Sequence, residues 1–228
     1  MKLHFGRSIL LAVLACAIGV SMAGAARFWA RRHAFTPVAR ESAERAERDL
    51  AVANLTSFQR KLLAELDREV RAGIIYQDGY YVGGDPPDGI GVCSDVVIRG
   101  FRAAGVDLKQ TVSMDVRSAK SAYRIDTPDP NIDHRRCRNL AVFFRRQGQE
   151  LPLTGKPESW APGDIVLWST RGNGYIDHVG IVSTGHDPQG NPTIIHHWPG
   201  LPVTETDGLF RFRVMGHDRW RAQPTHGQ

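Results

Sequence analysis

Cys93 stands where a glycine-rich turn leads into an apolar helical pattern. Residues 88–91 form the turn, and the apolar stripe continues to Ala104. A thiol at a helix N-terminus lies near unpaired backbone N–H groups and the positive end of the helix dipole, and both favour the thiolate. Lowering the thiol pKa from about 8.5 by about two units takes roughly 2.7 kcal/mol, which a helix N-terminus together with an imidazolium can supply. Cys93 is therefore a candidate nucleophile, although packing on the stripe alone would also explain it.

The first turn of this helix carries two polar residues, Ser94 and Asp95. Backbone amides at this position can bind the oxyanion of a tetrahedral intermediate, and we expect Ser94 and Asp95 to support it. A carboxylate at Asp95 would either complement the helix dipole or raise the pKa of the Cys93 thiol. The sequence does not decide which of these two effects is larger.

Two histidines occupy positions from which they could assist this thiol. His178 opens an apolar run that continues to Val182, and His196 lies near the end of the next such run. Residues 186–191 include Asp, Pro, Gly and Asn, which are typical of the turn of a β-hairpin. The two strands should therefore be neighbours and bring His178 and His196 side by side. One imidazole would then take the thiol proton while the other orients it. His197 should face the opposite way, unless a shift of register exchanges the two.

The other cysteines permit several interpretations. Cys16 falls in an N-terminal apolar segment, which leaves Cys93 and Cys137 to form one disulfide or to act as one reactive and one buried thiol. The apolar stripe around Cys137 favours the second. A zinc site from His134 and Cys137 with His178 or His197 is an alternative, but no His-Glu-x-x-His or paired Cys-x-x-Cys spacing supports it. We expect no metal or organic cofactor.

The sequence predicts helices followed by a sheet, which would position Cys93, His178 and His196. Helical spacing is predicted for residues 41–72, 93–104 and 133–148, with Asp133 as the N-cap of the third helix. Short β-rich runs follow at residues 165–168, 178–183, 193–197 and 209–215. Helices followed by short strands indicate an α+β fold, with N-terminal helices packed on a small antiparallel sheet.

The N-terminal residues have the order of a secretory signal peptide. Lys2 and Arg7 precede an apolar run at residues 9–20, and small residues follow at 21–25. We therefore predict export to the periplasm or cell envelope; if the segment stays uncleaved, it is the chain's only expected membrane contact. The segments predicted are a signal peptide or anchor (1–25), a tether (26–40), a hydrolase domain (41–222) and a tail (223–228).

Composition sets wider limits on function. The chain has 228 residues, 42% of them hydrophobic, which suits one domain with an ordinary core. Its formal net charge is +5, and removing Lys2 and Arg7 with the signal leaves 5 − 2 = +3. A mildly basic protein suits anionic polymers, but no Arg-rich stripe interleaved with aromatic residues indicates nucleic acid as a partner.

Several motifs, taken in order, resemble known families. The order of residues 91–95, 162–166, 178–182 and 194–196 is similar to that of NlpC-type papain-like cell-wall peptidases. The chain more closely resembles the bacterial YijF-like family, catalogued as domain-of-unknown-function family 1287, over roughly residues 45–221. That resemblance rests on residues 83–85, 93–99, 131–136, the strand at His178 and residues 216–219. It implies a papain-like fold with Cys93, His178 and His196 as the catalytic residues. The chain departs from NlpC-type domains at Asp95, where those usually carry glycine.

The resemblance also suggests a substrate. It implies a secreted amidase or endopeptidase that cleaves peptidoglycan stem peptides, which are rich in carboxylates. Arginine forks bind carboxylates in a bidentate manner, so substrate contacts are predicted for Tyr81, Asp133, His134, Arg135 and Arg136. The alternative for the 133–136 cluster is a helix start with a structural Asp–Arg pair. For the whole protein, the alternatives are a non-catalytic envelope-binding module on the same fold and a zinc hydrolase.

Overall fold

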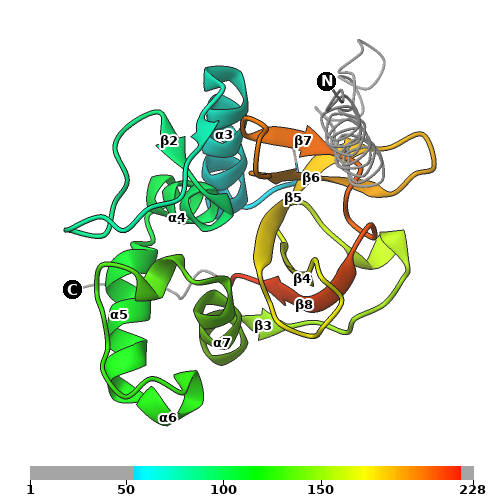
Figure 1. Ribbon diagram of the computed structural model, residues 1–228. Coiled ribbons are helices and arrows are strands. Elements are labelled where there is room, and N and C mark those ends of the chain that lie inside the picture. The colour runs from blue at the N-terminus through cyan, green and yellow to red at the C-terminus, as the bar shows by residue number, and fades with distance from the viewer. Residues whose placement is uncertain (1–53, 222–228) are drawn as a thin grey trace, which may run out of the picture. The chain divides into compact units, whose positions relative to one another are not determined.

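The computed structural model describes residues 54–221, all of which belong to one compact unit. The predicted signal peptide, tether and tail lie outside the described residues. Helices come first in the described chain and a six-stranded, antiparallel sheet follows, so the predicted α+β class is confirmed (Figure 1). Within residues 54–221, no helix is both long and apolar enough to cross a bilayer.

The helices supply one layer of the fold. Their bounds are α3 (Ser57–Ala72), α4 (Cys93–Ala103), α5 (Leu108–Ser118), α6 (Lys120–Tyr123) and α7 (Cys137–Gln147). α3 starts after Thr56, whose side chain accepts from the Gln59 N–H, and ends at Gly73 in the left-handed conformation. The predicted helix over residues 41–72 is therefore wrong at residues 54–56, because the Thr56 cap starts a helix at Ser57. The sequence prediction also missed α5 and α6.

The sheet has the strand order β3-β8-β4-β5-β6-β7. Its strands are β3 (Gln149–Glu150), β4 (Ile165–Ser169), β5 (His178–His186), β6 (Pro192–His196), β7 (Thr204–Thr206) and β8 (Arg213–Arg219). A separate parallel pair, β1 (Ile75–Tyr76) and β2 (Ile90–Gly91), leads into α4. The predicted hairpin is confirmed, because His186 of β5 pairs with Pro192 of β6. The final predicted strand, 209–215, starts four residues too early, and β1, β2, β3 and β7 were missed.

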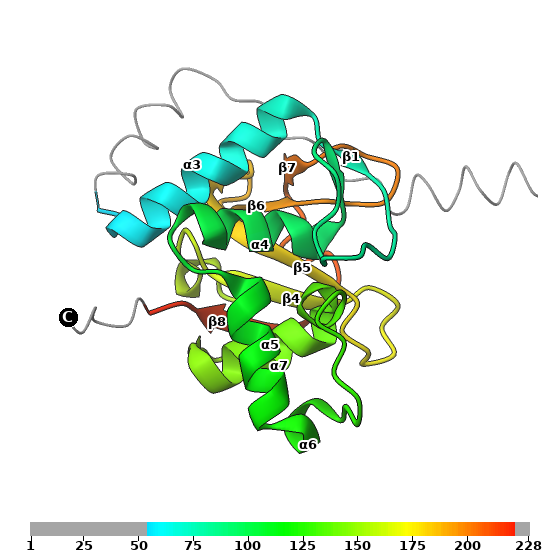
Figure 2. The same ribbon diagram turned by 90° about the vertical axis from the view of Figure 1, so that its left-hand side faces the viewer.

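Strand alternation divides the buried side chains between the two faces of the sheet. Ile165, Leu167, Val179 and Ile181 join the core formed with the helices, whereas Val166, Trp168 and Val182 join a smaller cluster. Figure 2 shows α4, α5 and α7 in front of the strands.

Helices α3 and α4 pack closely, and the contact depends on a glycine. A Cβ at Gly100 of α4 would lie 2.7 Å from Leu62 of α3. α4 also packs against β5, so the helix that starts at Cys93 is held between α3 and the strand that starts at His178.

The start of the third predicted helix differs from expectation. Asp133 was predicted as its N-cap, but residues 133–135 form a separate 3-10 turn and α7 begins at Cys137. The Asp133 carboxylate instead accepts the backbone N–H of Asp129 at 2.7 Å, which closes the preceding loop. The shift places Cys137 in the first turn of α7.

Candidate active site

Cys93 is the first residue of α4 and is 6% exposed. Val92 before it is extended, and its N–H donates to the Asp95 carboxylate at 2.8 Å, which fixes the entry into the helix. A Cβ at Gly91 would lie 3.0 Å from the Asp95 Cβ, so the turn before the nucleophile favours glycine. The local sequence thus holds the thiol at the N-terminus of α4, as predicted.

A second thiol lies directly beside the first. The Sγ atoms of Cys93 and Cys137 are 3.6 Å apart, and each belongs to the first residue of its own helix, α4 or α7. The hydrogen bond from Cys137 lowers the pKa of the Cys93 thiol well below its usual range, although burial opposes the shift. The same bond, together with burial, raises the pKa of Cys137. Cys137 therefore stabilises a Cys93 thiolate, a role that the sequence did not reveal.

His178 opens β5 and lies within reach of Cys93. Its charge and a hydrogen bond to the thiol also lower the pKa of Cys93, as does a backbone hydrogen bond from Val179. The Nε2 atom of His178 is 2.8 Å from the Nδ1 atom of His196. Because Nε2 is occupied in this way, Nδ1 of His178 is the nitrogen left to exchange a proton with Cys93.

His196 continues this hydrogen-bond chain into the sheet. Its Nε2 atom lies 3.1 Å from the Thr206 Oγ1 of β7. Burial lowers the pKa of His196 well below its usual range, and the nearby His178 lowers it further, so His196 is neutral. A neutral ring can accept the Nε2–H of a protonated His178 at Nδ1 while its own Nε2–H donates to Thr206. Thr206 was not predicted, because three-residue β7 has too little periodicity to identify.

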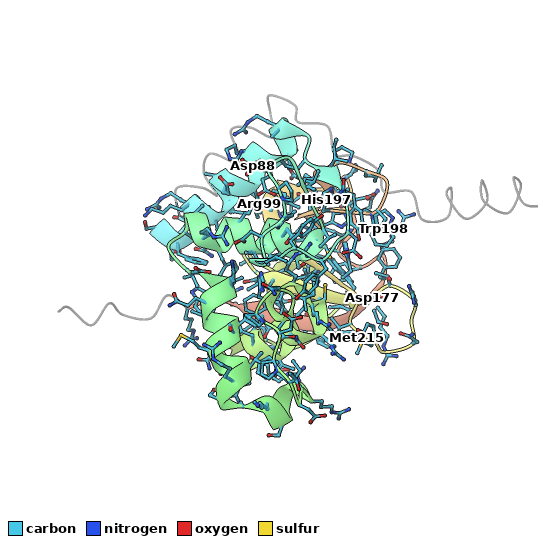
Figure 3. All side chains as sticks on the ribbon, turned by 60° about the vertical axis from the view of Figure 1, so that its left-hand side comes forward. Asp88, Arg99, Asp177, His197, Trp198 and Met215 are labelled. Carbon is cyan, nitrogen blue, oxygen red and sulfur yellow. The ribbon has the colours of Figure 1, made fainter. Side chains whose placement is uncertain are left out.

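Aromatic rings surround His178. Its ring centroid is 5.0 Å from that of Trp198 and 5.4 Å from that of Trp168. Figure 3 shows Trp198 on the same side of the molecule as Asp177, which directly precedes His178. Such packing restricts the imidazole to few orientations.

His197 lies away from this chain, in agreement with strand alternation. In Figure 3 it is drawn between Arg99 and Trp198, and its ring centroid is 5.1 Å from that of Tyr76. Burial lowers the pKa of His197 to about 4, and the charge of Arg99 contributes. Of the two adjacent histidines, His196 is therefore the one beside His178.

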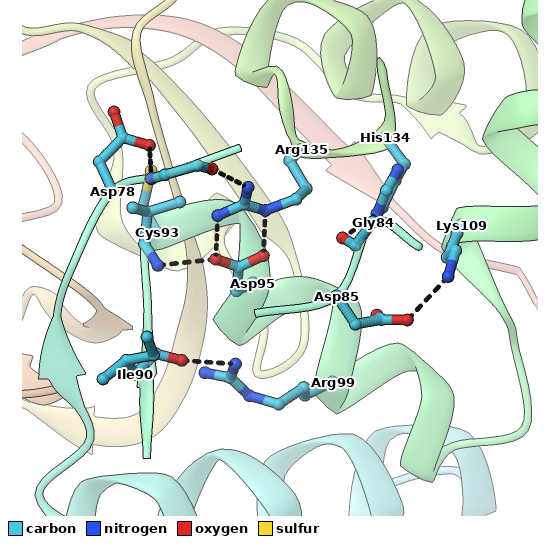
Figure 4. Close-up of polar contacts among 12 residues, drawn as sticks. Asp78, Gly84, Asp85, Ile90, Cys93, Asp95, Arg99, Lys109, His134 and Arg135 are labelled. Carbon is cyan, nitrogen blue, oxygen red and sulfur yellow. Dashed lines mark hydrogen bonds and ion pairs between the residues drawn. The ribbon is translucent and has the colours of Figure 1, made fainter. Parts of the chain in front are cut away.

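A buried ion pair lies behind the nucleophile (Figure 4). Nε and Nη2 of Arg135 donate to the Asp95 carboxylate at 2.7 and 2.9 Å, and the two side chains are 1% and 3% exposed. Nη1 of Arg135 donates to the Gly79 carbonyl at 2.6 Å, and its guanidinium lies 5.0 Å from the Tyr81 ring centroid. Arg135 thus joins the loop around Gly79 to the first turn of α4.

The residues predicted to contact substrate in this region are mostly buried and bonded within the protein, and substrate contact by them stays a prediction. Arg135 and Asp133 are bonded within the protein, as described above, and His134 is buried with Nε2 3.1 Å from the Gly84 carbonyl. The Tyr81 hydroxyl is buried, and its ring packs beneath Arg135. Only Arg136 is exposed. The alternative of a structural Asp–Arg pair fits better, with Asp95 as the partner in place of Asp133.

The first N–H groups of α4 are the candidate oxyanion donors. Within residues 54–221, no protein acceptor is found for the backbone N–H of Cys93 or Ser94, whereas those of Asp95 and Val96 donate to the Val92 carbonyl. Unpaired amides beside a nucleophile can bind a developing oxyanion. The Asp95 side chain supports these amides through Val92 rather than contacting the oxyanion itself.

No group of three or more His, Cys, Asp or Glu side chains in the described part of the chain is arranged to hold a metal ion. Two side chains of the proposed zinc set have other partners, because His134 Nε2 lies 3.1 Å from the Gly84 carbonyl and Cys137 Sγ lies 3.6 Å from Cys93 Sγ.

Comparisons with known proteins agree with the motifs. A family described as "Domain of unknown function (DUF1287)" matches residues 62–220. The uncharacterized protein YijF of Escherichia coli (strain K12) is 38% identical over 161 residues, which cover 67% of this chain and 77% of YijF. Among solved structures, NlpC1 from Trichomonas vaginalis matches with a TM-score of 0.45 and 15% identity. That match covers 75% of this chain but only 46% of NlpC1, so the chain spans less than half of its length.

Proposed function

The chain belongs to the DUF1287 family, as its motifs predicted, and from its site we propose that it is an exported cysteine hydrolase of peptidoglycan stem peptides. One observation carries this proposal: the Cys93 thiol, with its pKa lowered at the start of α4, lies beside His178, which is itself bonded to His196. This is the nucleophile, base and orienting group of a thiol hydrolase.

The mechanism follows from the proton positions. The Cys93 thiolate attacks the amide carbonyl carbon, and the N–H groups of Cys93 and Ser94 bind the oxyanion. His178 gives its Nδ1 proton to the leaving nitrogen as the carbon–nitrogen bond breaks, which leaves a thioester on Cys93. His178 then takes a proton from water, the hydroxide attacks the thioester, and cleavage of the carbon–sulfur bond releases a carboxylic acid and restores the thiolate.

His196 and Thr206 act as positioning residues in this scheme. When His178 carries two ring protons, its Nε2–H needs an acceptor, and the neutral His196 supplies one at Nδ1. The Thr206 hydroxyl can accept a hydrogen bond from the other nitrogen of His196, which is compatible with the tautomer in which Nδ1 is free of a proton.

The proposed substrate class is argued from the sequence, whereas the mechanism is argued from the geometry of the site. The N-terminal sequence favours export to the compartment that holds peptidoglycan, and the motif order is similar to that of NlpC-type cell-wall peptidases. The net positive charge favours contact with an anionic polymer.

The test is digestion of purified peptidoglycan, followed by mass spectrometry of the released muropeptides. We expect the wild-type protein to release fragments that have gained one water across an amide bond. Cys93→Ala should release none, because alanine removes the nucleophile, while its circular dichroism and Tm stay close to those of the wild type.

Three outcomes would contradict the proposal. Equal products from both proteins would remove Cys93 from the reaction, and no products from either would favour the non-catalytic envelope-binding module. Loss of wild-type activity on adding a chelator, with recovery on adding Zn²⁺, would favour the zinc hydrolase.

A further inference from the structure

The closeness of Cys93 and Cys137 is more than catalysis by a single thiol requires. Their sulfur atoms lie 3.6 Å apart, against about 2.05 Å in a disulfide. Both cysteines are free thiols in the structure, and the only other cysteine of the chain is Cys16. Cys93 is buried, whereas Cys137 is partly exposed.

The two thiols are also matched in chemistry. Thiol–disulfide exchange needs one sulfur as thiolate to attack and a second thiol to resolve the mixed disulfide. The hydrogen bond between the sulfurs, together with His178, holds the negative charge on Cys93, while Cys137 keeps its proton. The pair therefore has an attacking sulfur and a resolving sulfur in contact before any oxidant arrives.

We propose that Cys93 and Cys137 form a reversible intrachain disulfide, so that the site is a dithiol/disulfide couple with a small disulfide as its oxidant. The Cys93 thiolate attacks one sulfur of the small disulfide, which forms a mixed disulfide and releases one small thiolate. Cys137 then gives up its proton and attacks the Cys93 sulfur, which breaks the mixed disulfide and releases the second small thiolate. Two protein thiols are oxidised, and one small disulfide is reduced to two thiols.

This couple would regulate the hydrolase. A sulfur bonded to Cys137 cannot attack a carbonyl, so oxidation would switch the site off and reduction would restore it. An exported protein works where disulfides persist, so the couple would encounter oxidants there. The regulatory consequence rests on the proposed function, whereas formation of the disulfide does not.

The test uses the full chain, reduced and then equilibrated in glutathione buffers from reducing to oxidising, alkylated and mapped by peptide mass spectrometry. We expect a linked peptide pair carrying Cys93 and Cys137, lighter by two hydrogens, with both thiols lost to alkylation together. Peptide mapping separates this pair from Cys16. Excess dithiothreitol should return both thiols.

Cys137→Ser is the matched variant, since a hydroxyl can still donate a hydrogen bond but cannot resolve a mixed disulfide. We expect it to accumulate glutathione on Cys93 under buffers in which the wild type is linked. A persistent glutathione adduct on wild-type Cys93, with Cys137 still a free thiol, would overturn the proposal. So would a wild-type protein in which Cys93 and Cys137 both remain thiols in oxidised glutathione.

Measuring peptidoglycan hydrolysis on the same samples distinguishes failure of the disulfide proposal from failure of the proposed hydrolase function. Linked peptides in a protein that never cleaves peptidoglycan would support the couple and contradict the hydrolase. If hydrolysis is present, it should fall in proportion to the linked fraction, and undiminished hydrolysis by fully linked protein would show that Cys93 is not the nucleophile.

Discussion

Replacing His178 with alanine is expected to lower kcat/KM for muropeptide hydrolysis by roughly 10²–10⁴-fold, the usual contribution of a general acid–base group. The variant loses the group that protonates the leaving nitrogen, and it also loses the charge and hydrogen bond that help to keep Cys93 ionised. The measurement is the initial rate of release of a defined muropeptide fragment at neutral pH.

His186 provides a matched control for this prediction. It lies at the other end of the same strand, β5, and is exposed. His186→Ala should stay within about two-fold of the wild type, since exposed substitutions away from such sites change little. A His178→Ala protein that is folded and keeps wild-type rates would show that another group carries the proton.

Replacing Arg135 with methionine is expected to destabilise the fold by about 3–5 kcal/mol. The substitution leaves the Asp95 carboxylate buried without its bidentate partner, and it removes the hydrogen bond to the Gly79 carbonyl. A buried charge that loses its partner keeps its desolvation penalty, which is why the effect is large. The measurement is the free energy of unfolding from chemical denaturation.

The neighbouring residue and a double variant test this explanation. Arg136→Met changes an exposed side chain, so its unfolding free energy should stay within about 0.5 kcal/mol of the wild type. Adding Asp95→Asn to Arg135→Met removes the stranded charge and should recover part of the lost stability. A loss below about 1 kcal/mol for Arg135→Met would mean that the pair contributes little to the fold.

The sequence was most informative where local pattern determines geometry. The apolar stripe after Gly91 predicted α4, and strand alternation with the 186–191 hairpin predicted that His178 and His196 would be neighbours. Alternation also predicted that His197 faces away. Each of these depends on residues within about twenty positions of one another, where backbone periodicity fixes the outcome.

The rest of the site depends on packing between distant segments. Asp95 and Arg135 are 40 residues apart and Cys93 and Cys137 are 44 apart, so neither contact can be deduced before α4 is placed against the 3-10 turn at residues 133–135 and the start of α7. Periodicity likewise says little about two- and three-residue strands such as β7, which carries Thr206.

One missed element did leave a signal. Leu108, Val112 and Val116 of α5 recur at four-residue steps and are all buried, and Asp107 before them caps the helix. That spacing, with an N-cap, is the pattern by which the other helices were identified.

The most direct test of the Cys93–His178 pair is the rate of Cys93 alkylation by iodoacetamide as a function of pH, followed by peptide mass spectrometry. Because the pKa of Cys93 is lowered well below its usual range, more of the thiolate should persist as the pH falls, so the alkylation rate should drop much less between pH 8 and pH 6 than that of an ordinary cysteine. An ordinary cysteine would react about 80-fold more slowly at pH 6 than at pH 8. His178→Ala should shift the profile toward that behaviour. A wild-type Cys93 whose rate falls with pH as a free cysteine does would contradict the account.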